Sequence, residues 1–571
     1  MLHRAVLAAC LLSSIVAGCA RKADLVITGG MVWTGLSSGR AQPGAVAIGR
    51  GRILAVGDSA AVAPYVGSRT RVLTAGGGLV MPGFVDGHTH FIDGGFQLAS
   101  IDLRTAATPQ EFIRRIAEYA QHLKPGQWIT GGDWDHTLWK GAPLPRKDWI
   151  DSATPSNPVF VTRLDGHEAL ANSAAFRAAN VSKDTPTPPG GEILRDPRTG
   201  EPQGIVKDQA LGLVERAIPP PPPAERDSAL ARALAHAAAL GVTATAHMNA
   251  SWADFASYRR MERAGRMTLR VVLYLPLEQW RDIADTIRRQ GQGDDWVRIG
   301  GCKGFMDGSA GSRTAYFFQP YADSAGYYGL LQHPEASMRA WIGAADSAGL
   351  QVTVHAIGDR SNAMLLSIYD SVARAHGARD RRFRIEHAQH LRPEDIPAFG
   401  ERGVIPSMQP YHAIDDGRWV EQRIGPERIR TTYAFRRLLD TGAKLAFGSD
   451  WTVAPLDPLL GVYAAVTRRT LDGKHPDGWV PEQKVTVAEA LRAYTWGNAW
   501  ATFNESKWGT LAPGNFADVV VLDRNLFLMP ADSLDRARVR YTIVGGRIVF
   551  AEGVASPPRP SRSRRSPPLG A

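Results

Sequence analysis

Eight short apolar runs, most of them separated by stretches with helical periodicity, limit the fold of this chain more than any other feature. Stretches such as 337–348 and 362–375 repeat their apolar residues at the period of an α-helix. Alternating strands and helices predict right-handed βα units and a parallel sheet, and eight units predict a closed (β/α)8 barrel of the TIM type. The runs begin near Leu79, Val242, Arg270, Arg298, Gln351, Phe383, Val404 and Lys444.

Short β-like runs at both ends of the chain predict a second, smaller domain. Glycine-rich turns separate four runs between residues 25 and 73, and two more runs follow at 517–522 and 541–549. Neither group has enough strands to bury a face by itself. The two ends are therefore expected to meet in one small β-sandwich.

A long interval interrupts the barrel pattern after its first strand. Residues 91–224 are too many for one crossover, and five consecutive prolines at 219–223 form a stiff spacer near the end of this interval. We therefore predict an inserted subdomain. The predicted division is a signal peptide at 1–18, the first part of the sandwich at 19–78, the barrel at 79–505 with its insertion at 91–224, the second part of the sandwich at 506–553, and a disordered basic tail at 554–571.

The N-terminus has the pattern of an export signal. Arg4 precedes an apolar run from Ala5 to Ala17, which is too short to span a bilayer but suits the core of a signal peptide. The run ends in Val-Ala-Gly-Cys at 16–19, which resembles the bacterial lipobox with Cys19 as the lipidated first residue. We expect an exported lipoprotein anchored in the cell envelope; an ordinary secretory signal, giving a periplasmic or secreted enzyme, is the alternative. Cys302 would then be the one remaining thiol, which excludes an internal disulfide.

The net charge does not indicate a nucleic-acid-binding protein. A formal charge of +10 is modest for 571 residues, and part of it lies in the Pro/Ser/Arg-rich tail. A solvated, disordered end accounts for such a tail more simply than contact with a nucleic acid. The composition, with 44% hydrophobic and 21% charged residues, is that of a soluble globular protein.

Two histidines one residue apart close the sequence PGFVDGHTH, which begins at the first predicted barrel strand. Alternate side chains of a strand share a face, so His88 and His90 point the same way and can hold one divalent ion. A His-x-His pair alone is weak evidence, because surface and core histidines are common. Four further candidate ligands strengthen the interpretation.

The four further candidates lie at the ends of other predicted strands. Lys303 lies in the fourth strand, and the fifth, sixth and eighth strands are closed by His355, His387 and Asp450. Barrel active sites gather at the C-terminal ends of the strands. Each residue alone has an ordinary structural explanation, such as a core histidine, a helix cap or a surface cation, but together they favour a metal site.

Lys303 differs from the other candidate ligands, because a protonated amine has no lone pair to offer a metal ion. A protonated amine would repel a nearby cation, so the side chain must be deprotonated or chemically altered beside metal ions. Uptake of carbon dioxide would make a carbamate, whose two oxygens can bridge cations roughly 3.5–4 Å apart. Cys302 is expected to point to the opposite side of the strand.

These residues resemble those of the amidohydrolase superfamily, and the resemblance covers nearly the whole chain after the signal. It includes PGFVDGHTH, the strand-end residues above, and GTLAPGNFADVVVLD at 509–523. The segments at 164–175 and 303–315, with VHAIGD and IEHAQ, resemble the branch that contains N-substituted formamide deformylase.

The resemblance implies a binuclear site, most often of zinc. His88, His90 and Asp450 would hold one ion and His355 and His387 the other, with a carboxylated Lys303 and a hydroxide bridging them. The hydroxide would attack an amide carbon, and Asp450 would move its proton to the departing amine. His167 matches a histidine of this branch and would bind the substrate carbonyl or oxyanion; a structural loop histidine is the alternative.

Other side chains have open roles. Trp134, Trp139 and Tyr316 either line an apolar pocket or pack in a core. His247, at the end of the second predicted strand, is expected to lie behind the metal ligands.

The sequence therefore predicts a metal-dependent hydrolase that cleaves a non-peptide C–N bond of a small-molecule amide, as a monomer or a homo-oligomer. Two alternatives remain. A deaminase of the superfamily would carry a glutamate three residues after the fifth-strand histidine, where this chain has Gly358. A non-catalytic, lipid-anchored metal- or ligand-binding protein would be favoured by loss of a ligand, and none is lost.

Overall fold

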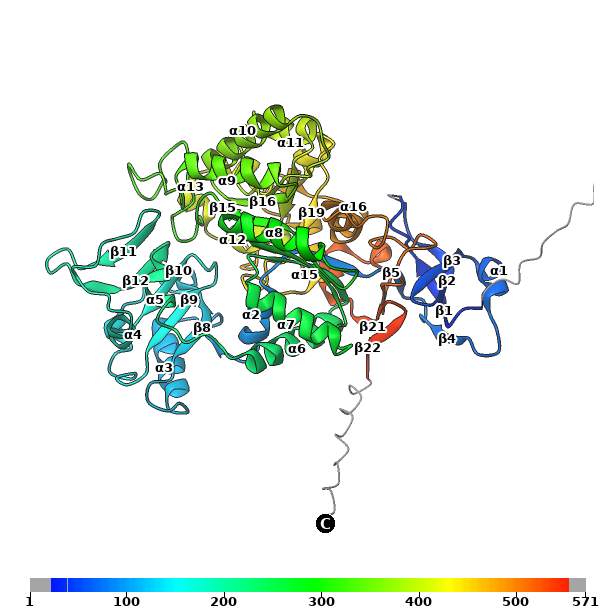
Figure 1. Cartoon of the computed structure of the whole chain (residues 1–571), viewed down its shortest axis with the longest axis horizontal. Helices are drawn as coiled ribbons and strands as arrows, with labels where there is room; N and C mark the ends of the chain where they lie inside the picture. Colours follow the sequence, from blue (N-terminus) through cyan, green and yellow to red (C-terminus); the bar gives the residue numbers. More distant parts are fainter. Residues whose placement is uncertain (1–21, 38, 554–571) are drawn as a thin grey trace, which may run out of the picture.

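A parallel sheet of eight strands forms the centre of the protein (Figure 1). The computed structural model describes residues 22–37 and 39–553. Each barrel strand pairs with the next one in sequence, and the first and last are joined where Asp450 N donates to His88 O at 2.8 Å. The strands are β6 (Phe84–Thr89), β13 (Val242–Met248), β14 (Arg270–Pro276), β15 (Val297–Phe305), β16 (Gln351–Ala356), β17 (Arg384–His387), β18 (Ile405–Met408) and β19 (Ala446–Phe447). The predicted barrel is confirmed.

The first barrel strand begins at Phe84, so the prediction of a start near Leu79 is wrong. Leu79–Pro82 forms β5, which pairs with β1 (Leu25–Val32) in another sheet. A run of four apolar residues fits any buried strand, and its periodicity does not tell to which sheet it belongs. Gly83 separates the two strands, and a Cβ there would lie 2.2 Å from side-chain atoms of Thr243.

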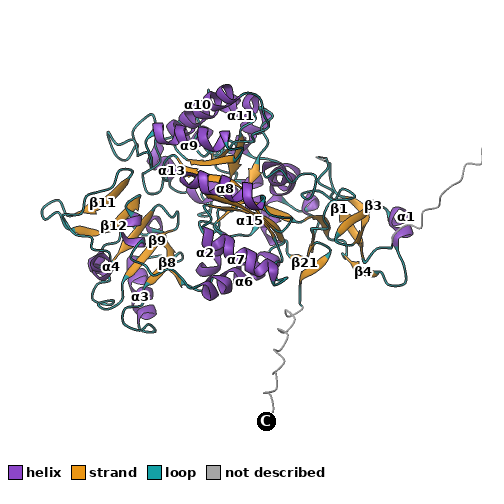
Figure 2. Cartoon of the chain, viewed as in Figure 1, coloured by secondary structure: helices purple, strands orange, loops and turns teal. Residues whose placement is uncertain are grey.

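Helices surround the barrel and bury their apolar faces against it (Figure 2). The predicted helices at 337–348 and 362–375 correspond to α9 (Glu335–Ser347) and α10 (Asp359–His376). The helix α7 (Trp252–Arg263) begins with a capping box between Ser251 and Asp254. The helices of this layer are α2 (Phe91–Gln97), α6 (Pro223–Ala239), α7 (Trp252–Arg263), α8 (Trp280–Gln290), α9 (Glu335–Ser347), α10 (Asp359–His376), α11 (Ile396–Arg402), α12 (Pro410–Asp416), α13 (Val420–Ile424), α14 (Phe435–Asp440), α15 (Pro458–Thr467), α16 (Val487–Arg492) and α17 (Asn498–Ala501).

Both ends of the described chain meet in one eight-stranded sheet, at the right of Figure 1. The strand β20 (Val519–Leu522) pairs with β5, with Val520 opposite Met81. Ile27 of β1 packs in the same cluster as Val521 of β20 and Ile543 of β21, so the sheet folds over and buries its inner face. The remaining elements are β2 (Gln42–Gly49), β3 (Arg52–Gly57), α1 (Ser59–Val62), β4 (Arg71–Thr74), β20 (Val519–Leu522), β21 (Val539–Val544) and β22 (Arg547–Ala551).

The insertion after the first barrel strand has a six-stranded sheet of its own, at the left of Figure 2. Trp134 and Trp139 pack against Phe112 in its core, with ring centroids 6.4 and 5.4 Å from that of Phe112. These tryptophans therefore pack in a core and do not line the cavity described below. The elements are β7 (Ile101–Asp102), α3 (Pro109–Ala120), β8 (Ile129–Trp134), β9 (Val159–Arg163), β10 (Glu168–Ala171), α4 (Ser173–Ala178), β11 (Gly191–Arg195), β12 (Pro202–Asp208) and α5 (Leu211–Glu215).

The predicted signal peptide, the anchor at Cys19 and the basic tail lie outside the described residues. Among the residues that are described, no helix combines the length and the apolar character needed to cross a membrane.

Candidate metal centre

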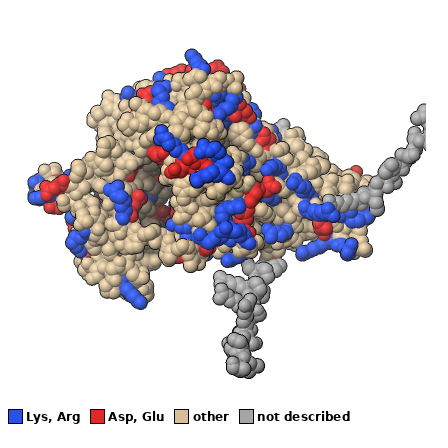
Figure 3. All heavy atoms as spheres, in the orientation of Figure 1, with Lys and Arg blue, Asp and Glu red and all other residues tan. Residues whose placement is uncertain are grey.

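One cavity at the C-terminal ends of the barrel strands is lined by all six predicted metal ligands. The ring centroid of His387 lies 5.0 Å from that of His88 and 4.5 Å from that of His355. The surface is hollowed where the insertion meets the barrel (Figure 3). The six residues are His88 in β6, His90 directly after it, Lys303 in β15, His355 in β16, His387 at the end of β17, and Asp450 after β19.

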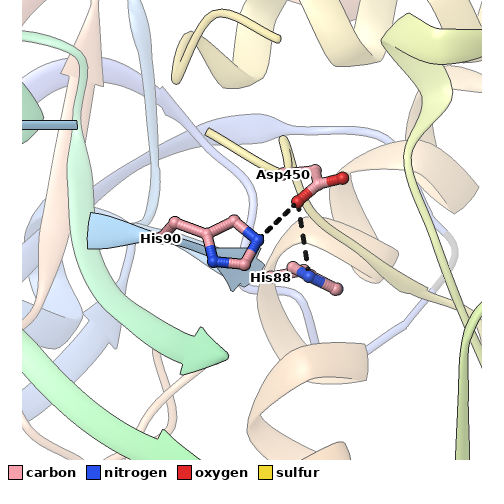
Figure 4. A group of neighbouring side chains, drawn as sticks. All are labelled: His88, His90 and Asp450. Carbon is pink, nitrogen blue, oxygen red and sulfur yellow. Dashed lines mark ion pairs between the residues drawn. The ribbon is translucent and has the colours of Figure 1, made fainter. Parts of the chain in front are cut away.

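His88, His90 and Asp450 form one group of side chains that could hold a metal ion (Figure 4). Asp450 Oδ1 lies 3.3 Å from His88 Nε2 and 3.2 Å from His90 Nε2. This oxygen is buried and has no hydrogen-bond partner among the described residues. Burial raises the pKa of Asp450, but the neighbouring histidines outweigh burial and hold the pKa well below its usual range. Two imidazole nitrogens around an unpartnered carboxylate oxygen fit a divalent cation.

His355 and His387 supply the second group of nitrogens. His387 Nδ1 lies 2.8 Å from Gln409 Oε1, which leaves Nε2 for a metal ion. His355 Nε2 lies 3.1 Å from Gly308 O, which leaves Nδ1. His412, which sequence reasoning missed, forms with His387 and Asp450 a different group of side chains that could also hold an ion. It lies within α12 and not at a strand end, so its position gave no signal.

Lys303 is buried in the cavity wall among these groups. Its Nζ lies 4.7 Å from the ring centroid of Phe305, and desolvation lowers the pKa of the amine to about 8. A neutral amine is therefore accessible near neutral pH. Cys302 packs in the hydrophobic core instead, and burial raises the pKa of its thiol well above the usual value. The two side chains lie on opposite sides of β15, as predicted.

Glu386 supports the metal site from behind, and sequence reasoning missed it. Its Oε2 accepts a hydrogen bond from His88 Nδ1 at 2.6 Å and from Ser407 Oγ at 2.7 Å, while Arg384 Nε lies 2.9 Å from Oε1. Burial raises the pKa of Glu386, but Arg384 and His88 outweigh it and lower the pKa far below its usual range. A carboxylate on Nδ1 fixes the ring so that Nε2 faces Asp450. In the sequence, Glu386 is marked only by its place in the motif IEHAQ, which begins at Ile385.

His167 reaches the same cavity from the insertion. Its ring centroid lies 5.0 Å from that of His355, and its Nδ1 lies 2.7 Å from Asp208 Oδ1. Burial lowers the pKa of His167, but the hydrogen bond and charge of Asp208 outweigh burial, so the pKa is raised. His247 does not line the cavity; its Nδ1 lies 3.0 Å from the hydroxyl of Tyr258. Tyr316 does not line it either, and its ring lies beneath the guanidinium of Arg360.

A row of alternating basic and acidic side chains forms the outer wall of the cavity. Arg163 Nη1 lies 2.5 Å from Asp165 Oδ2, and Arg163 Nη2 lies 3.5 Å from Asp135 Oδ1. Arg418 continues this row: its Nη2 lies 3.3 Å from Asp135 Oδ2, and it also pairs with Asp415. These ion pairs join the insertion to α12 across the mouth of the site. Sequence reasoning missed them because the partners come from segments far apart in the sequence.

Comparisons with known proteins agree with this geometry. The family model described as "Amidohydrolase family" matches residues 71–550. The chain is 39% identical over 540 residues to Protein LONG AFTER FAR-RED 3 of Arabidopsis thaliana, covering 92% of each chain. It is 27% identical over 519 residues to N-substituted formamide deformylase of Arthrobacter pascens, covering 88% of this chain and 94% of the other. An uncharacterized metal-dependent hydrolase from Pyrococcus horikoshii OT3 has a similar solved structure, with a TM-score of 0.71, 27% identity, and coverage of 89% of this chain and 99% of that one.

Proposed function

Because the chain belongs to the amidohydrolase family, as a metal-dependent hydrolase of the branch that includes N-substituted formamide deformylase, we propose that it cleaves a C–N bond of a small, non-peptide amide. One observation carries the proposal. Asp450 Oδ1 is buried and unpartnered among the described residues, between Nε2 of His88 and Nε2 of His90. A carboxylate held in this way can both bind a cation and accept a proton.

The donor set suits two divalent cations, and zinc is the simplest assignment because imidazole and carboxylate ligands suit it. His88, His90 and Asp450 would hold one ion, and His355 and His387 the other. Lys303, carboxylated on Nζ, would bridge the two. When bound, the ions would supply hydroxide at neutral pH, because metal contact lowers the pKa of water from 15.7 to about 7.

The side chains around the centre have separable roles in this proposal. Asp450 accepts the proton of the attacking water and delivers it to the departing amine. His167 donates from Nε2 to the oxygen of the substrate carbonyl as negative charge develops there. Glu386 keeps the ring of His88 in the orientation and tautomer that a ligand needs.

Gly358 gives no support to the deaminase alternative. A Cβ at this position would lie 2.1 Å from Tyr316 O, so the backbone leaves no room for a side chain that could protonate a ring. The N–H of Gly358 donates to the carboxylate of Asp307 at 2.8 Å.

The proposal is tested by metal analysis together with a panel of N-formyl and N-acyl amines. We expect two ions per chain, turnover of at least one amide, loss of turnover on chelation and recovery with zinc. Release of ammonia from amino heterocycles, with no amide cleaved, would favour the deaminase. A fully metallated protein that turns over neither class of compound would favour the non-catalytic binding protein.

A His167→Ala variant should lose kcat by roughly 10²–10³, the cost of removing one oxyanion donor. Its metal content should stay unchanged, because His167 is not one of the proposed ligands. His122→Ala is the matched control, since His122 is an exposed histidine of the same insertion. Normal kinetics for His167→Ala would reduce this histidine to a structural loop residue.

We also propose that the protein is exported and anchored through Cys19, as the lipobox-like segment predicts. One acyl chain binds a membrane only marginally, but the several chains of a bacterial lipoprotein hold it firmly. Cys19→Ala removes the residue that would carry them, so the protein should move from the membrane fraction to the soluble fraction. Cys10→Ala, in the same segment, is the control and should fractionate as the wild type does. If Cys19→Ala fractionates as the wild type does, the lipoprotein proposal fails, and an ordinary secretory signal, giving a periplasmic or secreted enzyme, replaces it.

A further inference from the structure

The antiparallel register of β10 and β12 brings His167 and Asp208 together. Glu168 lies opposite Lys207 in this pair, so the residues just outside, His167 and Asp208, also face each other. Asp208 N donates to His167 O at 3.0 Å, and His167 Nδ1 lies 2.7 Å from Asp208 Oδ1. Two hydrogen bonds, one from the backbone and one between side chains, therefore define the position of the histidine.

The carboxylate of Asp208 is itself held in place. Its side chain is fully buried, and its backbone has a φ of 47°, in the left-handed region that aspartate tolerates better than most residues. Gln332 Nε2 donates to Asp208 Oδ1 at 3.1 Å and lies 3.1 Å from Asp307 O. Gln332 and Asp307 belong to the barrel, so this contact ties the insertion to the loop that follows β15.

Gly308 connects this carboxylate to the metal site. A Cβ on Gly308 would lie 2.7 Å from Asp208 Oδ1 and 1.9 Å from Thr314 Oγ1, so only glycine allows the approach. The carbonyl of the same residue lies 3.1 Å from Nε2 of His355. Gly308 therefore lies between the carboxylate of Asp208 and His355, a proposed metal ligand.

We propose that Asp208 is a positioning residue of the reaction, which holds the His167 ring through Nδ1 and leaves Nε2 to donate to the substrate oxygen. The inference rests on the proposed function, because the donor has a role only where an oxyanion forms. A carboxylate oxygen 2.7 Å from Nδ1 orients the ring, so that Nε2 and not Nδ1 faces the substrate. Without Asp208 the ring could rotate and present either nitrogen.

A double-mutant cycle separates this role from a purely structural one. Asp208→Asn should lower kcat by about 10–100-fold, as loss of a carboxylate behind a functional histidine does, with KM and metal content little changed. In a His167→Ala background the same substitution should have almost no further effect on kcat, because residues that act as a unit are not additive. Asparagine has nearly the same shape and accepts positive φ, so the variant should fold.

Asp196→Asn is the matched control, because Asp196 belongs to the same insertion and lies in the turn between β11 and β12. Unchanged kcat in Asp208→Asn, or an equal loss in both backgrounds, would overturn the inference. A crystal structure of Asp208→Ala decides independently: with no side-chain oxygen to accept from Nδ1, the ring of His167 should be turned or displaced, and an unmoved ring contradicts the positioning role. If the wild-type enzyme cleaves no amide, the proposed function fails and that structure alone tests Asp208.

Discussion

An Asp450→Asn variant should lose roughly 10²–10⁴-fold in kcat, the range expected when a general acid–base group is removed. The backbone hydrogen bond from residue 450 to His88 O remains, and asparagine tolerates the φ of 59° at this position. The amide nitrogen or oxygen would replace Oδ1 between two imidazoles, and neither accepts a proton near neutral pH. The measurement is kcat together with metal content per chain.

Asp450→Asn should reduce turnover much more than it reduces the stability of the fold. We expect the unfolding temperature to change little, whereas the ion held by His88 and His90 should be depleted because one of its three ligands becomes neutral. Asp440→Asn is the control, since that carboxylate is 63% exposed at the end of α14 and does not line the cavity. If Asp450→Asn retains kcat within a factor of a few, proton transfer belongs to another residue.

The barrel could be predicted from sequence because strands and helices alternate with distinct periods. The first barrel strand is β6 and not β5, because the periodicity of an apolar run does not tell which sheet the run joins. Four apolar residues before Gly83 satisfy the terminal sheet as well as the barrel, and only tertiary pairing with β1 and β20 assigns them. The tryptophans of the insertion were ambiguous for the same reason, because a buried aromatic ring suits a core and a pocket equally.

The metal ligands could be predicted because each lies at or near the end of a barrel strand, where the fold gathers side chains. Asp208 could not, because it lies 41 residues from His167 and meets it only through the register of two insertion strands. His412 lies inside a helix, so no strand-end rule applies to it. Residues that hold other residues in place leave little local pattern, since their partners are chosen by the folded structure.

Lys303→Ala should lose the bridge between the two proposed cation sites, much of the bound metal and nearly all turnover. The lysine is buried among His88, His355, His387 and Asp450 in the wall of one cavity, where an ammonium would repel divalent ions. Once the ammonium has lost a proton, the amine can react with carbon dioxide to form an Nζ–C bond and release a second proton, which converts a cationic side chain into an anionic ligand. Crystallographic density should show three additional atoms on Nζ; intact-mass measurement would miss them, because acid removes carbon dioxide.

Two further variants and a chemical rescue complete the test of Lys303. Lys303→Arg should fail as completely as Lys303→Ala, because a guanidinium keeps its charge and does not form the carbamate. Short carboxylic acids with added metal should partly restore Lys303→Ala, since a free carboxylate can occupy the vacated volume. Lys444→Ala is the control, because Lys444 is exposed just before β19, at the end of the barrel opposite the cavity. Two ions and near-normal rates in Lys303→Ala would show that no bridge is needed, and a mononuclear site on His88, His90 and Asp450 with one more histidine would then describe the centre better.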